Sequence, residues 1–143
     1  MVKWDEKSIA HVYQGMRDHS LPYAEWSHQA HISTGLAFLD EFGLEQAEIL
    51  MPKAIWTYNA SLGNENSDTE GYHHTITLLY LRVLDTLRNK CGSTDLQSLV
   101  RAALQSEIAD KSWPLTHYSK ELLFSVKARK NWVEPDLKPL PTS

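Results

Sequence analysis

Hydrophobic residues recur along this chain at the three- and four-residue spacing of an α-helix. No segment alternates between hydrophobic and polar residues with the period of two that is typical of a strand. The pattern predicts five helices. The first spans about residues 5–20, the second begins between 22 and 27 and ends near 43, and the third spans about 44–62. The fourth begins at the end of the loop 64–71 and ends near 91, and the fifth spans about 95–109. The chain is therefore expected to be all-α.

Local signals refine this picture. Pro52 lies inside the third predicted helix, where proline removes a backbone hydrogen bond, so a kink or a break is expected there. Residues 67–70 (Ser-Asp-Thr-Glu) have the spacing of a capping box for the fourth helix. Beyond residue 110 the pattern gives way to short helical turns capped by Ser119 and Ser125 and to a tail with three prolines. The sequence thus predicts one helical domain over 1–143: a bundle of four to five helices over about 5–110, then short turns and an extended, proline-containing tail over 111–143.

Composition limits the classes of function. The 143 residues carry a formal net charge of −4, which argues against nucleic acid and an anionic membrane surface as partners. No stretch approaches the roughly 18 apolar residues of a membrane span, and the first residues lack the apolar region of a signal peptide. The single cysteine cannot form an internal disulfide, so a cytoplasmic location is expected. A monomer and a homodimer fit the sequence equally well.

Seven histidines are a high count for a chain of this length. His28 and His31 are three positions apart at the start of the apolar face of the second predicted helix, so both rings should point into the bundle. His73 leads the apolar face of the fourth predicted helix, and His74 lies toward its rim. His28, His31 and His73 therefore predict a mononuclear site for a divalent transition metal, with zinc favoured over iron, nickel or copper. Three protein ligands leave one coordination position open, which is the catalytic pattern.

Other side chains are expected to complete this site. Glu25 and His74 are the candidates for proton transfer, because carboxylates and imidazoles serve as acids and bases near neutral pH. Four residues are expected to line the substrate pocket: Trp26, Tyr58, Asn59 and Thr77. The remaining histidines, His11, His19 and His117, are expected at the surface or at helix caps, and the five tryptophans in the core.

Three strings in the chain resemble a group of small bacterial helical proteins that have no settled activity: Glu-Trp-x-His-x-x-His at 25–31, Tyr-Asn at 58–59 and Gly-Tyr-His-x-Thr-Ile-Thr at 71–77. A carboxyl-terminal pattern from Tyr118-Ser119 to Leu140-Pro141 belongs to the same resemblance, which covers about residues 20–141. The resemblance implies that His28, His31 and His73 belong to the shared motifs. At His74 the group's pattern has a glutamate, and an imidazole could take its place as ligand or base. No particular chemistry follows from the resemblance.

Three hypotheses for the function remain. The first is a metal-dependent hydrolase or oxidase that acts on a small molecule, in which zinc would lower the pKa of a bound water or iron or copper would activate oxygen. The second is a non-catalytic module that binds a small molecule, or haem held by the same histidines. The third is a structural protein that holds no metal and in which the inward-facing histidines are only hydrogen-bonded.

Overall fold

The computed structural model describes residues 3–92 and 94–141, and these residues form helices and turns with no strand among them. The longer helices are α1 (Glu6–Asp18), α2 (His28–Ser61), α3 (His74–Cys91) and α4 (Leu96–Leu104). The shorter elements are η1 (Tyr23–Glu25), η2 (Glu107–Ala109), η3 (Trp113–Thr116), α5 (Lys120–Leu123) and α6 (Val126–Lys130). The predicted all-α bundle is confirmed. None of the described helices combines the length and the hydropathy that crossing a membrane requires.

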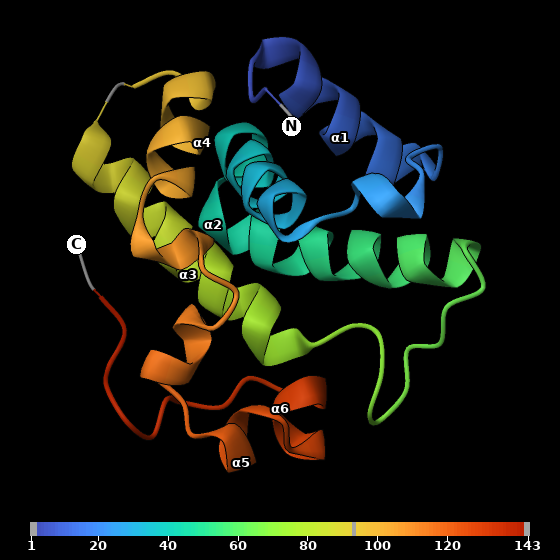
Figure 1. Cartoon of the computed structure of the whole chain (residues 1–143), viewed down its shortest axis with the longest axis vertical. Helices are drawn as coiled ribbons and strands as arrows, with labels where there is room; N and C mark the ends of the chain where they lie inside the picture. Colours follow the sequence, from blue (N-terminus) through green and yellow to red (C-terminus); the bar gives the residue numbers. More distant parts are fainter. Residues whose placement is uncertain (1–2, 93, 142–143) are drawn as a thin grey trace.

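Helix α2 is the centre of the bundle and packs against α1, α3 and α4 (Figure 1). Its two halves run in different directions because Gly43 leaves the helical conformation, with φ 79° and ψ 169°. A positive φ of this size carries a steric cost for residues with a Cβ, and glycine lacks that atom. The predicted boundary near Gly43 is therefore confirmed as a sharp bend. α5 and α6 lie at the end of the molecule opposite α1 and α4, where α6 packs on α3.

Of the kink or break expected at Pro52, the break is absent, since α2 keeps helical dihedral angles on both sides of this residue, and the kink stays a prediction. A proline inside a helix costs about 3 kcal/mol. The buried side chains of Met51, Ile55 and Tyr58 hold this part of α2 against the core and offset that cost.

The predicted capping box is also wrong, because Ser67 closes a turn within the loop. Its hydroxyl accepts from the backbone N–H of Thr69 and of Glu70, and α3 begins only at His74. The N-cap of α3 is His73, whose Nδ1 accepts from the backbone N–H of Ile76 at 3.2 Å. Imidazole is not among the preferred N-cap side chains, so the sequence pattern pointed to the serine instead.

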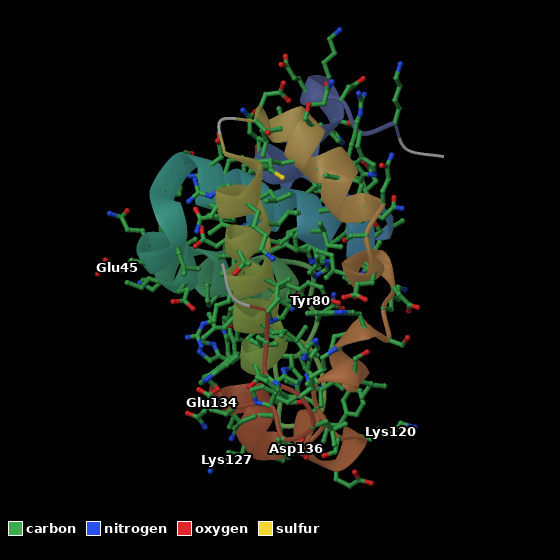
Figure 2. The ribbon with its side chains drawn as sticks, turned by 90° about the vertical axis from the view of Figure 1, so that its left-hand side faces the viewer. Glu45, Tyr80, Lys120, Lys127, Glu134 and Asp136 are labelled. Carbon is green, nitrogen blue, oxygen red and sulfur yellow. The ribbon has the colours of Figure 1, made fainter. Side chains whose placement is uncertain are left out.

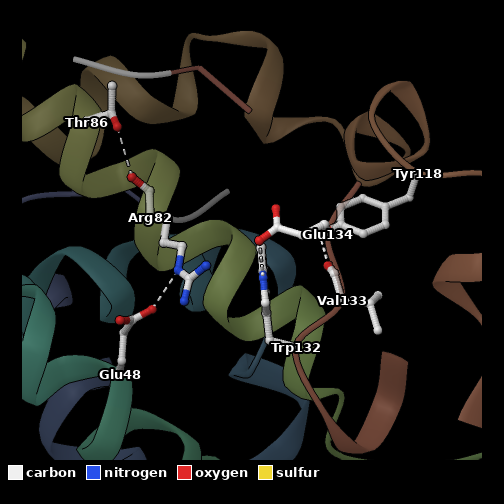
Figure 3. Close-up of polar contacts among 7 residues, drawn as sticks. All are labelled: Glu48, Arg82, Thr86, Tyr118, Trp132, Val133 and Glu134. Atoms are coloured by element: carbon white, nitrogen blue, oxygen red, sulfur yellow. Dashed lines mark hydrogen bonds and ion pairs between the residues drawn. The ribbon is translucent and has the colours of Figure 1, made fainter. Parts of the chain in front are cut away.

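The carboxyl-terminal tail crosses the outside of α3 (Figure 3). The guanidinium carbon of Arg82 lies 4.1 Å from the centroid of the Trp132 ring, and Arg82 Nε donates to Glu48 at 2.8 Å. The buried hydroxyl of Tyr118 donates to the carbonyl of Val133 at 2.7 Å. These contacts fix the tail to the bundle. The expected N-caps Ser119 and Ser125 are confirmed.

His117 is the C-cap of η3, one of the two kinds of position expected for it. It is only 2% exposed, with its ring centroid 4.8 Å from that of Trp113 and its Nδ1 donating to the carbonyl of Lys138 at 3.0 Å. Trp56, expected in the core, is 50% exposed. His19 is the C-cap of α1, as expected of a histidine at a surface or cap position.

Candidate ligand pocket

A cavity of about 340 Å³ lies between α2 and α3, and Lys111 contributes to its rim. Its walls are mainly hydrophobic and include Ile32, Met51, Ile55, Ile76, Leu81 and Leu84. The polar side chains that reach it are Ser27, His28, His31, Thr77, Tyr80 and Lys111. Small-molecule sites are typically concave, mostly apolar and about 300–1,000 Å³ in volume, with a few polar groups. The cavity meets that description at the small end of the range.

His31 enters the cavity from the first turn of α2. Its Nδ1 lies 2.8 Å from the carbonyl oxygen of Ser27, and its ring centroid lies 3.9 Å from that of Trp26. A carbonyl can only accept, so Nδ1 carries the proton and Nε2 keeps its lone pair. Burial is the main cause that lowers the pKa of His31 to about 4, and the nearby charge of Lys111 acts in the same direction. His31 is therefore neutral near pH 7 and offers an acceptor nitrogen.

His28 lies one helical turn before His31 and is half-buried. Its Nε2 donates to the carbonyl of Ile108 at 3.2 Å, so Nδ1 carries the lone pair. Burial lowers the pKa of His28, and the Lys111 ammonium lowers it further. Both imidazoles of the cavity are thus neutral near pH 7.

Tyr80 comes from α3 and points toward the segment that contains η2 and η3 (Figure 2). Its ring contacts His28, with 5.4 Å between centroids, and Trp113, with 5.8 Å. The hydroxyl is buried and has no hydrogen-bond partner among the described residues. Burial raises the pKa of Tyr80 well above its usual range, and the charge of Asp110 raises it further, so the hydroxyl keeps its proton. Tyr80 therefore lines the cavity, and its hydroxyl is an unused donor buried in the wall.

His73 is not part of this cavity. Its Nε2 donates to the carbonyl of Leu123 at 2.7 Å, while Nδ1 accepts from the backbone of Ile76. Both ring nitrogens are used in the structure, and neither has a lone pair free for a metal ion. His28 and His31 therefore lie together in the cavity, and the structure does not bring His73 to them.

No group of three or more His, Cys, Asp or Glu side chains within 3–92 and 94–141 is arranged to hold a metal ion. The predicted set of His28, His31 and His73 is not assembled in the structure. The two remaining imidazoles of that set, on consecutive turns of α2, each keep one nitrogen lone pair.

The two predicted proton-transfer residues lie outside the cavity. Glu25 is exposed, and its Oε1 accepts a hydrogen bond from Nε2 of His11 at 2.9 Å. His74 Nδ1 lies 2.7 Å from the hydroxyl of Tyr72, and burial is the main cause that lowers the pKa of His74.

Of the four predicted pocket residues, two line the cavity and two do not. Trp26 and Thr77 line the cavity. Tyr58 does not line the cavity: its ring contacts Trp26, with 5.7 Å between centroids, and its hydroxyl donates to the carbonyl of Leu21 at 2.7 Å. Asn59 faces the loop instead, where its Nδ2 donates to Asn66 Oδ1 at 3.1 Å. Their roles in binding stay predictions.

Two residues of the cavity were not singled out from the sequence. Tyr80 shares the helical face of His73, so its inward position follows from the three- and four-residue spacing, but no motif distinguishes it from a core aromatic. Lys111 lies in an irregular turn after η2, and its place at the cavity depends on a chain direction that periodicity does not encode.

No family model, no curated protein and no solved structure matches this chain. The resemblance of its motifs to small bacterial helical proteins stays a prediction. The geometry of the cavity is therefore the feature of this protein that indicates a function.

Proposed function

We propose that this protein binds a small, predominantly apolar molecule in the cavity between α2 and α3. The observation that carries the proposal is the cavity itself, which has a volume of about 340 Å³ and mainly hydrophobic walls. Pockets of this kind are the usual form of small-molecule sites in proteins.

The hydrophobic walls support the same proposal. Protein interiors are close-packed and contain few voids larger than a water molecule. An opening of about 340 Å³ with Ile55 and Leu84 in its walls costs stability unless something fills it. A small apolar molecule would recover that cost through burial of its own surface, at about 25 cal/mol per Å².

Binding without catalysis is the form of the proposal that the side chains support. Glu25 and His74, the two candidates for proton transfer, lie outside the cavity. A small molecule is the partner we propose, in keeping with the acidic net charge of −4, which disfavours nucleic acid. The cytoplasm is the compartment we propose, because the single cysteine has no partner for an internal disulfide.

The test is a titration with N-phenyl-1-naphthylamine, a neutral apolar probe whose fluorescence rises in hydrophobic surroundings. We expect binding to the wild type and about tenfold weaker binding to Ile76→Trp, because the added indole would fill the cavity. Ile49→Trp is the matched control, since it places the same side chain on a residue that is 60% exposed and away from the cavity.

A second measurement does not depend on a variant. In a ¹H–¹⁵N spectrum, the indole signal of Trp26 at the cavity should shift on addition of the probe. The indole of Trp56, which is exposed and does not line the cavity, serves as the internal control. Equal shifts of both signals, or none, would contradict binding in this cavity.

A divalent transition metal held by His28 and His31 is the second candidate function. The Ser27 carbonyl that accepts from His31 Nδ1 leaves Nε2 as the coordinating atom, which is the arrangement usual for metal-binding histidines. Neutral imidazole is also the metal-binding form. Water or a ligand in the cavity would supply the remaining coordination.

Calorimetric titration of chelator-stripped protein with Zn²⁺ near pH 7 tests this candidate. We expect one site in the wild type that is lost in His28→Ala and in His31→Ala. His11→Ala is the matched control, because it removes an exposed histidine that lies outside the cavity. Zinc binding that is absent in the wild type, or equal in all four proteins, would exclude it.

A further inference from the structure

We propose that the ligand of this cavity is a small, neutral aromatic molecule that carries an O–H or N–H donor, and that this donor binds to Nε2 of His31. A phenol and an indole have this chemistry. The inference rests on the proposed function, since it names the chemical class of ligand for the same cavity. It comes from the directions of the hydrogen bonds around the cavity, from the aromatic rings in its lining and from its volume.

The ring of His31 leaves one nitrogen free for a ligand. Nδ1 is held by the carbonyl of Ser27, whereas Nε2, at the end of the ring farthest from the backbone, has no hydrogen-bond partner among the described residues. Nε2 also differs from the Tyr80 hydroxyl, because it is not one of the fully buried polar atoms without a partner and so keeps accessible surface. His31 lines the cavity, and its Nε2 therefore offers a lone pair to a molecule there.

The other polar groups that the two helices bring to the cavity are acceptors as well. His28 donates from Nε2 to the carbonyl of Ile108, so the lone pair of Nδ1 remains. The hydroxyl of Thr77 donates to the carbonyl of His73 at 2.9 Å, so it can only accept a further hydrogen bond. The Tyr80 hydroxyl could donate, but it is buried in the wall. These groups favour a ligand that donates.

The charges around the cavity favour a donor that is neutral. Lys111 brings a positive charge that lowers the pKa of both His28 and His31, so a second cation is disfavoured at the same place. A carboxylate has no hydrogen to donate to a lone pair. The side chains of Ser27 and Lys111 can still donate to an anion, but both residues are exposed, and water competes for them.

The lining and the volume favour a flat ring system. The rings of Trp26 and His31 lie against each other with 3.9 Å between centroids, and the rings of His28 and Tyr80 also line the cavity. Aromatic rings pack well on one another in stacked and edge-to-face arrangements. A buried apolar cavity of about 150 Å³ holds one benzene ring. A cavity of about 340 Å³ therefore has room for two fused rings with one substituent.

The experiment compares 2-naphthol with 2-methoxynaphthalene, which has the same rings and the same oxygen but no donor. Both are titrated near pH 7 by their own fluorescence, with EDTA present so that no metal ion occupies the imidazoles. The affinity of 2-naphthol relative to 2-methoxynaphthalene should fall about fivefold to tenfold in His31→Phe, which keeps a ring beside Trp26 but loses the acceptor. His11→Phe is the matched control, because His11 is exposed and outside the cavity, and the ratio should stay unchanged.

A second measurement detects the hydrogen bond in the wild type and does not depend on a variant. In protein with ¹⁵N-labelled histidine, the signal of an unprotonated ring nitrogen moves toward the position of a protonated one when the nitrogen accepts a hydrogen bond. 2-Naphthol should move the Nε2 signal of His31 in this direction, and 2-methoxynaphthalene should move it much less. The ring nitrogens of His73, which does not line the cavity, are the internal control.

The outcomes separate the inference from the proposed function. An affinity ratio that is equal in the wild type and in His31→Phe, or an Nε2 signal that 2-naphthol does not move, would overturn the donor at His31. Binding of both naphthalenes would then leave the apolar pocket standing. Failure of both naphthalenes and of N-phenyl-1-naphthylamine to bind would overturn the proposed function together with this inference. If His31→Phe does not fold, the Nε2 signal of the wild type decides.

Discussion

His73 and the carbonyl of Leu123 are joined by a hydrogen bond of 2.7 Å that ties the beginning of α3 to the end of α5. The other ring nitrogen caps α3 by accepting from the backbone N–H of Ile76. Burial is the main cause that lowers the pKa of His73, so the ring stays in the neutral form that donates at one nitrogen and accepts at the other. This buried histidine connects two elements that are 50 residues apart in sequence.

His73→Ala should lower the free energy of unfolding by about 2–3 kcal/mol. About 1 kcal/mol comes from the lost N-cap, and the rest from leaving the Leu123 carbonyl without its donor. His73→Asn should lose about half as much, because asparagine is a good N-cap but is too short to replace the second bond. Urea unfolding followed by circular dichroism measures both. Equal midpoints for the wild type and His73→Ala would contradict the structural role.

The helices could be predicted from the sequence because their signals are local. Gly43, Gly92 and the N-caps Ser119 and Ser125 act within one turn of the chain, and three- and four-residue spacing marks the buried faces. The start of α3 could not be predicted in this way. Its cap is an imidazole that is held in place by a carbonyl 50 residues away, and that contact is visible only in the folded chain.

The candidate site was only partly predictable for the same reason. The spacing of His28 and His31 indicates that they share a face of α2, and they do meet in one cavity. The spacing of His73 indicates only that it is buried, which is true. Burial does not determine the partner, and in the structure a backbone carbonyl takes the place of the expected metal ion. Which interior group a buried histidine meets depends on the packing of the helices.

Gly71→Ala should destabilise the protein far more than Gly63→Ala, although both glycines have a positive φ near 80°. A Cβ at position 71 would overlap the carbonyl oxygen of Glu65 and come within 2.7 Å of Asn66 Oδ1, whereas nothing lies within 4 Å of a Cβ at position 63. We expect a loss of about 1 kcal/mol for Gly63→Ala, from backbone strain alone, and about 3 kcal/mol or more for Gly71→Ala.

Thermal unfolding of the two glycine variants provides the comparison. The Asn66 side chain also accepts from the backbone N–H of Tyr72 at 3.0 Å, so a displaced Asn66 would loosen the entry to α3 as well. Equal Tm values for the two alanine variants would contradict the close approach of the loop at Gly71.

Trp132→Ala should release the carboxyl-terminal tail from α3. This substitution removes the contact of the indole with the Arg82 guanidinium and the 3.0 Å hydrogen bond that the indole N–H donates to Glu134 (Figure 3). A cation–π contact of this kind contributes about 0.5–2 kcal/mol. We expect faster cleavage of the tail by a protease at low concentration, measured by mass spectrometry. Trp132→Phe is the control that keeps an aromatic ring under Arg82, and cleavage as slow in Trp132→Ala as in the wild type would contradict the anchoring role.

Stability should fall as the pH falls from about 6.5 to 4, and His31 should be one of its causes. Burial lowers the pKa of His31 to about 4 in the folded state, against the usual 6.5 in the unfolded chain. Above pH 6.5 the ring is neutral in both states and the pH has no effect through it. Between these values only the unfolded chain binds the proton, so folding is progressively disfavoured, and below about pH 4 the loss is complete.

His31→Gln should remove this part of the pH dependence. The lost stability that the ring explains amounts to about 2–3 kcal/mol over the interval, and His28 and His73, with pKa values lowered by burial, add to it in the same direction. Urea unfolding at a series of pH values should therefore give a flatter curve for His31→Gln than for the wild type between pH 4 and 6.5. His11→Gln replaces an exposed histidine and is the control. Parallel curves for His31→Gln and the wild type would show that His31 is protonated as readily in the folded protein as in the unfolded chain, and the neutral, acceptor imidazole assigned to the cavity would then be wrong.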